Sequence, residues 1–251
     1  MNEITELDVI AAIAARGGVA RLLGGRAVMN VCGDGMPDVL RRHSADIDLV
    51  TRGRDRRALK SAMADIGCEA EEEFNLLNGK ERMIFHAGGT KIDIFIDVFR
   101  MCHTLHFGDR LALHPITLPP CDLLLTKLQV FHAEHKDLSD AAALLLCCDL
   151  LPGSGEAPTI DTLYLSKLLG EDWGLWRTVT GTLRKLDEQA GDICKSPVLM
   201  KRLRDNIREL IKYLDSAPRS MGWRMRSIIG ERSVWYELPE EPTTTHPHAK
   251  G

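Results

Sequence analysis

The chain has 251 residues, of which 44% are hydrophobic and 27% are charged, and these proportions are ordinary for a globular protein. They exclude a collagen-like, coiled-coil or largely disordered chain. The formal net charge of −4 excludes strong general attraction to nucleic acid, because that attraction depends on an excess of lysine and arginine.

Up to about residue 118, helical and strand-like patterns alternate. The expected helices are 5–15, 26–32 and 56–67, and the expected strands are 20–25, 45–51, 68–74, 82–88 and 90–99. The pattern predicts that 68–74 and 82–88 form an antiparallel pair joined through Asn78 and Gly79. Unbroken alternation over 90–99 predicts one long strand.

From about residue 121 to 216 the periodicity is almost wholly helical. Helices are expected at 121–135 and 136–148, with one or two more between 161 and 190. Ser196 and Pro197 predict the start of a last helix that stops at Pro218, and its apolar stripe is Leu199, Leu203, Ile207, Leu210 and Leu214. We therefore expect an α+β fold, with a mixed β-sheet flanked by helices in domain 1–120, a helical domain at 121–216 and a tail at 217–251.

The tail interleaves arginines with large aromatic side chains, namely Arg219, Arg224, Arg226 and Arg232 with Trp223, Trp235 and Tyr236. This combination occurs in proteins that bind single-stranded nucleic acid. A closing strand or an arm packed on the body also explains this combination of residues, and we favour that simpler interpretation.

The sequence shows no membrane or export signal. Its longest apolar run, 141–148, is shorter than a membrane span, and its first eight residues are acidic rather than basic. Seven cysteines without a C-x-x-C spacing indicate reduced thiols rather than a disulfide framework or a zinc module. We expect a cytoplasmic protein that does not enter a membrane.

Aspartates occur in pairs on two of the predicted strands. Because side chains two positions apart project to the same face of a strand, Asp46 and Asp48 share one side of 45–51. Asp93 and Asp97 share one side of 90–99 in the same way. If the two strands are neighbours, a third carboxylate joins the first two. Either pair alone is better explained as part of a solvated sheet face.

Carboxylates gathered on a largely buried sheet repel one another and lose hydration, and a divalent cation offsets both costs. Their oxygens suit Mg²⁺, or Mn²⁺ in its place. Three such acids can hold two metal ions about 3.5–4 Å apart, an arrangement used for phosphoryl transfer. The adjacent Gly24 and Gly25, between a strand and a helix, present free backbone N–H groups that can hold a phosphate.

With LLGGRAV, ADIDLV and KIDIFID together, the chain resembles the minimal nucleotidyltransferases of the DNA polymerase beta-like superfamily over residues 18–150. DLLLTKLQ and KDLSDAAALL are similar to helices of the abortive-infection nucleotidyltransferase toxins. The resemblance implies that the chain binds a nucleoside triphosphate such as ATP with Mg²⁺. It also implies transfer of the nucleoside monophosphate to a hydroxyl, with release of pyrophosphate, and an antitoxin-like protein partner.

The resemblance also implies roles for single residues. Asp46 and Asp48 become metal ligands, and Asp93 or Asp97 becomes the third, with Asp93 preferred because it lies nearer the strand start. Gly24, Gly25 and Ser44 contact the triphosphate in this scheme. The gap between the glycines and Asp46 is longer than usual, and residues 33–43, GDGMPDVLRRH, are expected to form a loop beside the site.

Lys127 stands out on physical grounds. It lies on the apolar stripe of helix 121–135 with Leu124, Leu128 and Phe131, and lysine is rarely buried without a partner. Either its stem carries the ammonium group out to solvent, or the ammonium group reaches the triphosphate. Asp140 is placed to orient Lys127 or Lys136.

We therefore predict an enzyme, a nucleotidyltransferase with Asp46, Asp48, Asp93 and Lys127 at its catalytic centre. An RNA end such as that of transfer RNA, a small molecule and a protein side chain all remain open as acceptors. The alternative is a non-catalytic nucleotide sensor or a partner-binding subunit with the same fold.

Overall fold

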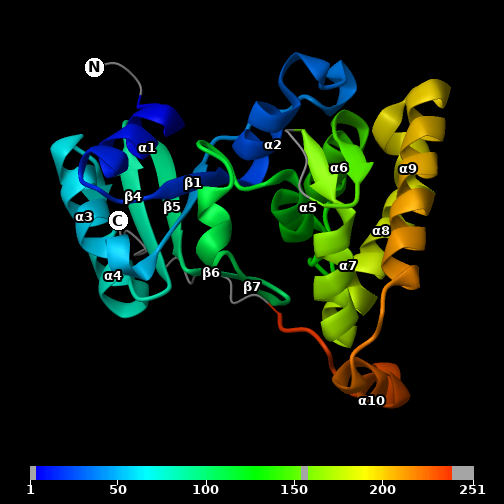
Figure 1. Ribbon diagram of the computed structural model, residues 1–251. Helices are drawn as coiled ribbons and strands as arrows, with labels where there is room; N and C mark the ends of the chain where they lie inside the picture. The colour runs from blue at the N-terminus through cyan, green and yellow to red at the C-terminus, as the bar shows by residue number, and fades with distance from the viewer. Residues whose placement is uncertain (1–3, 154–157, 239–251) are drawn as a thin grey trace, which may run out of the picture.

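A five-stranded mixed sheet lies at the centre of the N-terminal half (Figure 1). The structure is a computed structural model, and it describes residues 4–153 and 158–238. The strands follow the order β1-β2-β5-β4-β3, in which β2 runs parallel to β5 and the other neighbours are antiparallel. Their bounds are β1 Ala20–Leu23, β2 Ile47–Thr51, β3 Glu69–Ala70, β4 Arg82–Ala87 and β5 Thr90–Ile96.

Helices cover this sheet and connect it to the rest of the chain. Helix α1 (Glu6–Ala15) starts with a capping box between Thr5 and Asp8, and it packs on α3 (Arg56–Asp65) and β1. Helix α4 (Glu72–Asn78) packs on β4. Helix α2 (Gly24–Cys32) directly continues β1 and leads toward the helical half, where it contacts α5 and α6 (Figure 1).

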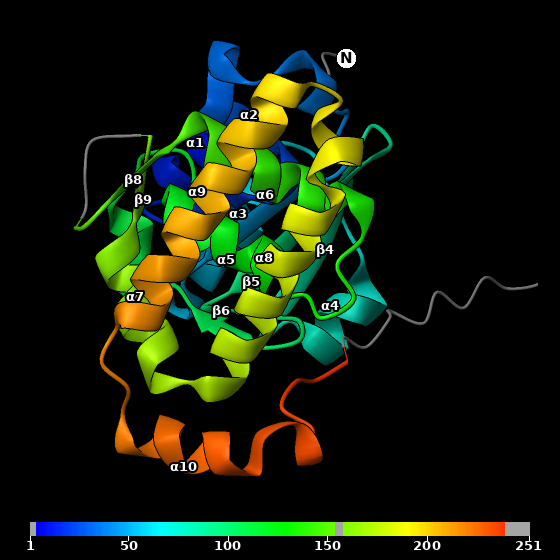
Figure 2. The same ribbon diagram turned by 90° about the vertical axis from the view of Figure 1, so that its right-hand side faces the viewer.

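The C-terminal half is helical, as expected. Its helices are α5 Pro120–Leu128, α6 His135–Cys147, α7 Thr162–Glu171, α8 Trp173–Cys194, α9 Pro197–Ser216 and α10 Met221–Ile229. Figure 2 shows α8 and α9 packed along each other, with α10 crossing beneath them. The predicted stripe of α9 is confirmed, because Leu203, Ile207, Leu210 and Leu214 are buried and Leu199 is partly buried against the core. No helix within the described ranges is both long and apolar enough to cross a membrane.

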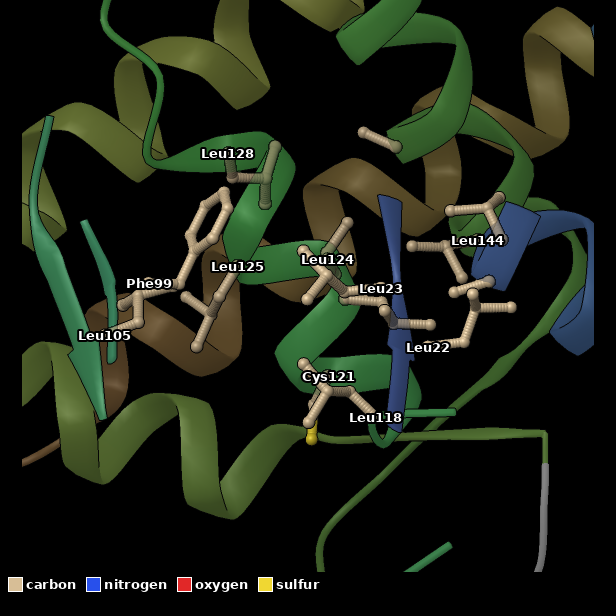
Figure 3. Packing of buried hydrophobic residues seen from close by; sticks show 14 of the residues in the cluster. Leu22, Leu23, Phe99, Leu105, Leu118, Cys121, Leu124, Leu125, Leu128 and Leu144 are labelled. Carbon is tan, nitrogen blue, oxygen red and sulfur yellow. The ribbon is translucent and has the colours of Figure 1, made fainter. Parts of the chain in front are cut away.

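One hydrophobic core joins the sheet to the helical half. Figure 3 shows α5 lying between β1 on one side and the short pair β6 (Val98–Arg100) and β7 (Thr104–His106) on the other. The backbone of Leu22 accepts a hydrogen bond from Leu118 N (3.0 Å) and donates one to Ile116 O (2.8 Å). The side chains of α5 therefore hold a fixed position relative to β1 and to the glycine turn that follows it.

Two expectations for the sheet were wrong. The predicted antiparallel pairing with β4 is confirmed only for Glu69 and Ala70, while α4 takes up 72–74 of the predicted strand and ends at Asn78, with Gly79 as its C-cap. Consecutive glutamates favour the first turn of a helix because they interact with its dipole, and Glu72 and Glu73 lie in that turn. The long strand 90–99 also breaks, since Asp97 adopts φ +62° and the chain leaves the sheet there.

Two expectations for the helical half also need correction. The helix predicted at 121–135 ends at Leu128, and a turn separates it from α6. The tail was expected to form a closing strand or a packed arm, and it forms α10, a helix that was not predicted, followed by an extended arm. The arm packs on the body, as its aromatic residues indicated, because the Tyr236 ring stacks on that of Phe131, with centroids 4.0 Å apart. Residues 239–251 of the predicted tail lie outside the described residues.

Candidate functional site

Asp48 and Asp93 lie side by side on the two central strands. Strands β2 and β5 pair in parallel with Asp48 directly opposite Asp93, and Leu23 is the partner of Asp48 on the other side. Residues opposite each other in a sheet project to the same face, so the predicted convergence of these two acids is confirmed. Asp46 precedes β2 and is exposed at the same edge.

The glycine turn approaches these acids closely. Gly24 has φ +74°, and a Cβ atom at this position would collide with the carboxylate of Asp48. A Cβ atom on Gly25 would collide with the guanidinium group of Arg42 and come within 3.2 Å of Ser44 Oγ. Both glycines are required because polar side chains lie directly against their Cα atoms. The two residues also form the first turn of α2, where backbone N–H groups lack intrahelical partners.

Burial and like charges shape the ionisation of the site. Burial, followed by the negative charges of Asp93 and Asp46, raises the pKa of Asp48 to about 6 against the opposing effect of Lys127. The ionised form of Asp48 is thus disfavoured at this position. Such perturbed carboxylates concentrate at functional sites.

Asp93 is committed to other side chains. Arg82 forms a two-point pair with its carboxylate, with Nε donating to Oδ1 at 2.7 Å and Nη2 donating to Oδ2. Lys91 Nζ lies 3.0 Å from the same Oδ2. The Asp93 side chain is only 3% exposed. Its role as third metal ligand stays a prediction. In that role, at least one carboxylate oxygen of Asp93 must give up its contacts with Arg82 and Lys91 to bind the metal ion.

Asp97 does not belong to the site, contrary to the expectation that it shares a face with Asp93. Its positive φ turns the chain out of the sheet, and its Oδ1 accepts a hydrogen bond from Gly53 N at 2.9 Å. It therefore caps the loop that follows β2. Strict alternation predicts a common face only while the backbone stays extended.

Lys127 lies inside the site rather than extending to bulk solvent, with 12% of its side chain exposed. Its Nζ is 2.9 Å from Asp140 Oδ2 and 3.5 Å from Asp137 Oδ1. The predicted orienting role of Asp140 is consistent with this geometry. Asp137 also completes the capping box of α6 with Glu134.

Arg42 is the residue that the sequence did not reveal. It donates to Asp140 from Nε (2.8 Å to Oδ1) and from Nη2 (2.5 Å to Oδ2). Asp140, 1% exposed, thus lies between two cations, Arg42 and Lys127. The loop GDGMPDVLRRH, which contains Arg42, was expected beside the site, and this was the one indication in the sequence. No side chain of the loop was assigned a role.

These residues line a cavity of about 240 Å³. Its walls are Gly25, Arg42, His43, Ser44, Ala45, Asp46, Asp48, Lys127 and Lys136. Its volume is below the roughly 300–1,000 Å³ of sites that enclose a whole drug-sized ligand, so it can enclose the charged part of a ligand and leave the rest outside. The loop wall is fixed by Arg26, which donates to the backbone oxygens of Ser44 and Ala45, both at 3.0 Å.

The cavity wall carries part of the ligand set that a metal ion uses. Over the residues that the structure describes, no group of three or more His, Cys, Asp or Glu side chains can hold a metal ion. Asp46 and Asp48 supply two carboxylates at the cavity wall. Mg²⁺ typically binds through one or two carboxylates and completes its shell with water and substrate phosphates. The residues present therefore fit Mg²⁺ bound together with a phosphate-bearing ligand.

No protein-family model matches the chain, and no curated protein matches it in sequence. The resemblance to polymerase beta-like nucleotidyltransferases therefore depends on the motif residues themselves. Their placement gives a chemical description of the site: two carboxylates, a glycine turn and three cations, Arg42, Lys127 and Lys136, around one cavity.

Proposed function

We propose that the protein is a nucleotidyltransferase that moves a nucleoside monophosphate from a nucleoside triphosphate to an acceptor hydroxyl. The observation that carries the proposal is the shared cavity, in which Asp46 and Asp48 face Gly25, Arg42 and Lys127. Carboxylates for a metal ion and cations for phosphate charge are the two requirements of phosphoryl-transfer chemistry. A cluster of ion pairs with a purely structural role would not need a cavity between the carboxylates and the cations.

The cationic wall binds the triphosphate in this proposal. Lys127 and Arg42 hold their positions through Asp140 before any ligand arrives, and such preorganised cations stabilise developing charge without further rearrangement. The backbone N–H groups at the start of α2 add a partial positive charge beside Gly25. Lys136 and Ser44 lie at the same wall.

The acidic wall serves the reacting centre. Asp46 and Asp48 would hold Mg²⁺, or Mn²⁺ in its place, and this ion when bound neutralises negative charge on the phosphate oxygens. The acceptor oxygen attacks the α-phosphorus, the bond from that phosphorus to the bridging oxygen breaks, and pyrophosphate leaves. A carboxylate of the Asp48–Asp93 pair accepts or relays the proton of the attacking hydroxyl.

The acceptor, a cytoplasmic location and an antitoxin-like partner stay predictions. Transfer RNA ends, small molecules and protein side chains each carry a hydroxyl group, and the cavity encloses only the charged part of a ligand. Incubating the protein with each α-labelled nucleoside triphosphate, Mg²⁺ and a cell lysate identifies the acceptor class. The label then enters one of RNA, protein or small molecules.

Asp48→Asn tests the catalytic assignment. We expect turnover to fall by about 10³-fold or more, because the amide removes a charged metal ligand at the reacting centre. Asp97→Asn is the matched control, since Asp97 lies outside the site and asparagine tolerates its positive φ. Full transfer activity in Asp48→Asn would show that the site assignment is wrong.

One observation favours a second candidate, a nucleotide sensor without turnover. Arg82 and Lys91 neutralise Asp93, so the third carboxylate is not free as it would be in a ready catalytic centre. A sensor binds a nucleoside triphosphate with Mg²⁺ and releases no pyrophosphate. Calorimetric binding combined with a pyrophosphate assay separates the two functions.

A further inference from the structure

Helix α4 presents two leucines on its outer side. Leu76 and Leu77 are 86% and 75% exposed, although burial of a leucine side chain is ordinarily favourable. The helix is held by its other side, where Asn75 donates to the backbone oxygen of Ile84 at 2.8 Å and accepts from the Ile84 N–H at 2.7 Å. Leu76 and Leu77 therefore project from a helix with a fixed position.

Acidic residues lie beside these two leucines. Glu72 and Glu73 are exposed and lie one turn earlier in α4, and residues three or four positions apart are neighbours on a helix. Neither forms an ion pair with another residue that the structure describes, whereas the preceding Glu71 lies 2.8 Å from His86 Nε2. We call Glu72, Glu73, Leu76 and Leu77 the α4 face.

Helix α10 carries a larger face of the same kind but with the opposite charge. Four of its apolar residues are at least 48% exposed, namely Met221, Met225, Ile228 and Ile229. Their spacing places them on one side of the helix, and the exposed Arg224 borders them. The opposite side packs on the body, since Trp223 contacts Trp176 and Arg226 lies over Trp173. We call Met221, Arg224, Met225, Ile228 and Ile229 the α10 face.

We propose that the α4 face of one copy of the chain binds the α10 face of another copy. Exposed apolar patches rimmed by polar residues mark interaction sites, and methionine adapts its shape to a partner surface. The charges are complementary, because Glu72 and Glu73 of one copy meet Arg224 of the next. Arg224, like the two glutamates, forms no ion pair within the described part of the chain.

The contact is between copies and uses both faces of each copy. The faces lie on different parts of one chain, with α4 beside the sheet and α10 below the helical half (Figure 1). A symmetric contact between two α10 faces is disfavoured, because Arg224 lies near the middle of the helix and would meet its own counterpart. A contact between unlike faces continues from copy to copy until a ring closes. This association stands whether or not the protein transfers nucleotides.

Sedimentation velocity of the full chain tests the proposal. We expect faster-sedimenting species to appear as the protein concentration rises, because a contact between two short helix faces is small and weak. Added salt should reduce the association, since it screens the exposed charges beside the two faces. A chain that stays monomeric over its whole soluble range would overturn the proposal, and an association that salt leaves unchanged would contradict the charge pairing.

Two variants with one altered face each make the test specific. Leu76→Gln with Leu77→Gln alters the α4 face, and Met225→Gln with Ile228→Gln alters the α10 face, while glutamine keeps a high helix propensity. Each variant alone should associate at least about 10-fold more weakly than the wild-type chain. An equimolar mixture should form a dimer through the intact face of each variant and stop there. Val198→Gln, at an exposed apolar position outside both faces, is the matched control.

Charge reversal provides an independent pair of variants. Arg224→Glu alone, and Glu72→Lys with Glu73→Lys alone, should each lose association because like charges then face each other. Mixing the two variants restores opposite charges and should restore the assembly. Association of the altered α4 variant by itself would show that the α10 face binds its own kind, and mixtures that stay monomeric would show that the two faces do not bind each other. Either result would refute the proposal.

Discussion

Arginine side chains line a cavity in the candidate site but pack against aromatic rings in the C-terminal tail. In the site, Arg42 pairs with the carboxylate of Asp140 beside an open cavity. In the tail, two arginines lie over indole rings. The Cζ atom of Arg219 is 4.7 Å from the Trp223 ring centroid, and that of Arg226 is 4.7 Å from the Trp173 ring centroid. The guanidinium groups of Arg219 and Arg226 are thus used in packing, which favours a packed tail over nucleic-acid binding.

The comparison shows that the groups around a cationic side chain decide whether it can bind a ligand or only stabilises the fold. Arg219 also donates to the backbone oxygen of Leu214 at 2.7 Å, and Arg226 donates to that of Gly230 at the same distance. These contacts stabilise the position of α10. A cation at a cavity wall, by contrast, remains able to meet a ligand. Four substitutions test this distinction.

The largest effect is expected at the cavity. Lys127→Met should lower kcat/KM for nucleotide transfer by about 10²-fold, because it removes a preorganised charge that faces the triphosphate. Steady-state kinetics with a nucleoside triphosphate and Mg²⁺ measures the change. Lys60→Met, an exposed substitution on α3, is the control, and an equal loss in both variants would remove Lys127 from the site.

Gly25→Ala should raise KM for the nucleotide by about 10-fold, since a displacement of about 1 Å in a positioning group is costly. The added Cβ displaces the Arg42 guanidinium group from its two-point contact with Asp140. Gly35→Ala is the control, because a Cβ atom there meets nothing within 4 Å. An unchanged KM in Gly25→Ala would show that the position of Arg42 does not matter for binding.

Arg219→Ala should lower the free energy of unfolding by about 1–2 kcal/mol and leave nucleotide binding intact, because it removes contacts with Trp176 and Trp223. Thermal unfolding and calorimetric titration measure the two quantities. Exposed Arg224→Ala should change stability by less than about 0.5 kcal/mol. Lost binding with unchanged stability would place Arg219 in a ligand site instead.

The smallest effect concerns Asp48 without metal. Its folded-state pKa of about 6 is above the ordinary value near 3.9, so its ionised form destabilises the fold as pH rises between these values. Asp48→Asn should therefore raise the free energy of unfolding by about 1 kcal/mol at pH 7.5, after allowance for solvent screening, and the gain should vanish near pH 4. Denaturant unfolding in chelator measures it, with Asp34→Asn, an exposed substitution away from Asp48, as the control. A destabilised Asp48→Asn at pH 7.5 would contradict the predicted charge strain.

The local sequence pattern was sufficient to predict which face of a strand a residue occupies, as long as the backbone stays extended. Alternation of isoleucine with aspartate indicated the face of Asp48 on one strand and of Asp93 on another, and the two acids meet because these strands are neighbours in the structure. The same reasoning failed for Asp97, because a single positive φ ends the alternation. It also failed at 72–78, where a short helix replaced the expected strand. The consecutive Glu72 and Glu73 were a local signal for the helix, whereas no local signal marked the positive φ of Asp97.

The sequence by itself determined most of the strands, the helical stripes and the types of charged group, because these depend on backbone periodicity and on burial of neighbouring apolar side chains. Only the tertiary structure decided which charges meet. Arg42 and Asp140 are 98 positions apart, and Asp93 pairs with Arg82 on the neighbouring strand. Partners at such separations are chosen by how the elements pack, because an ion pair depends on the positions of both groups in space and not on their spacing along the chain.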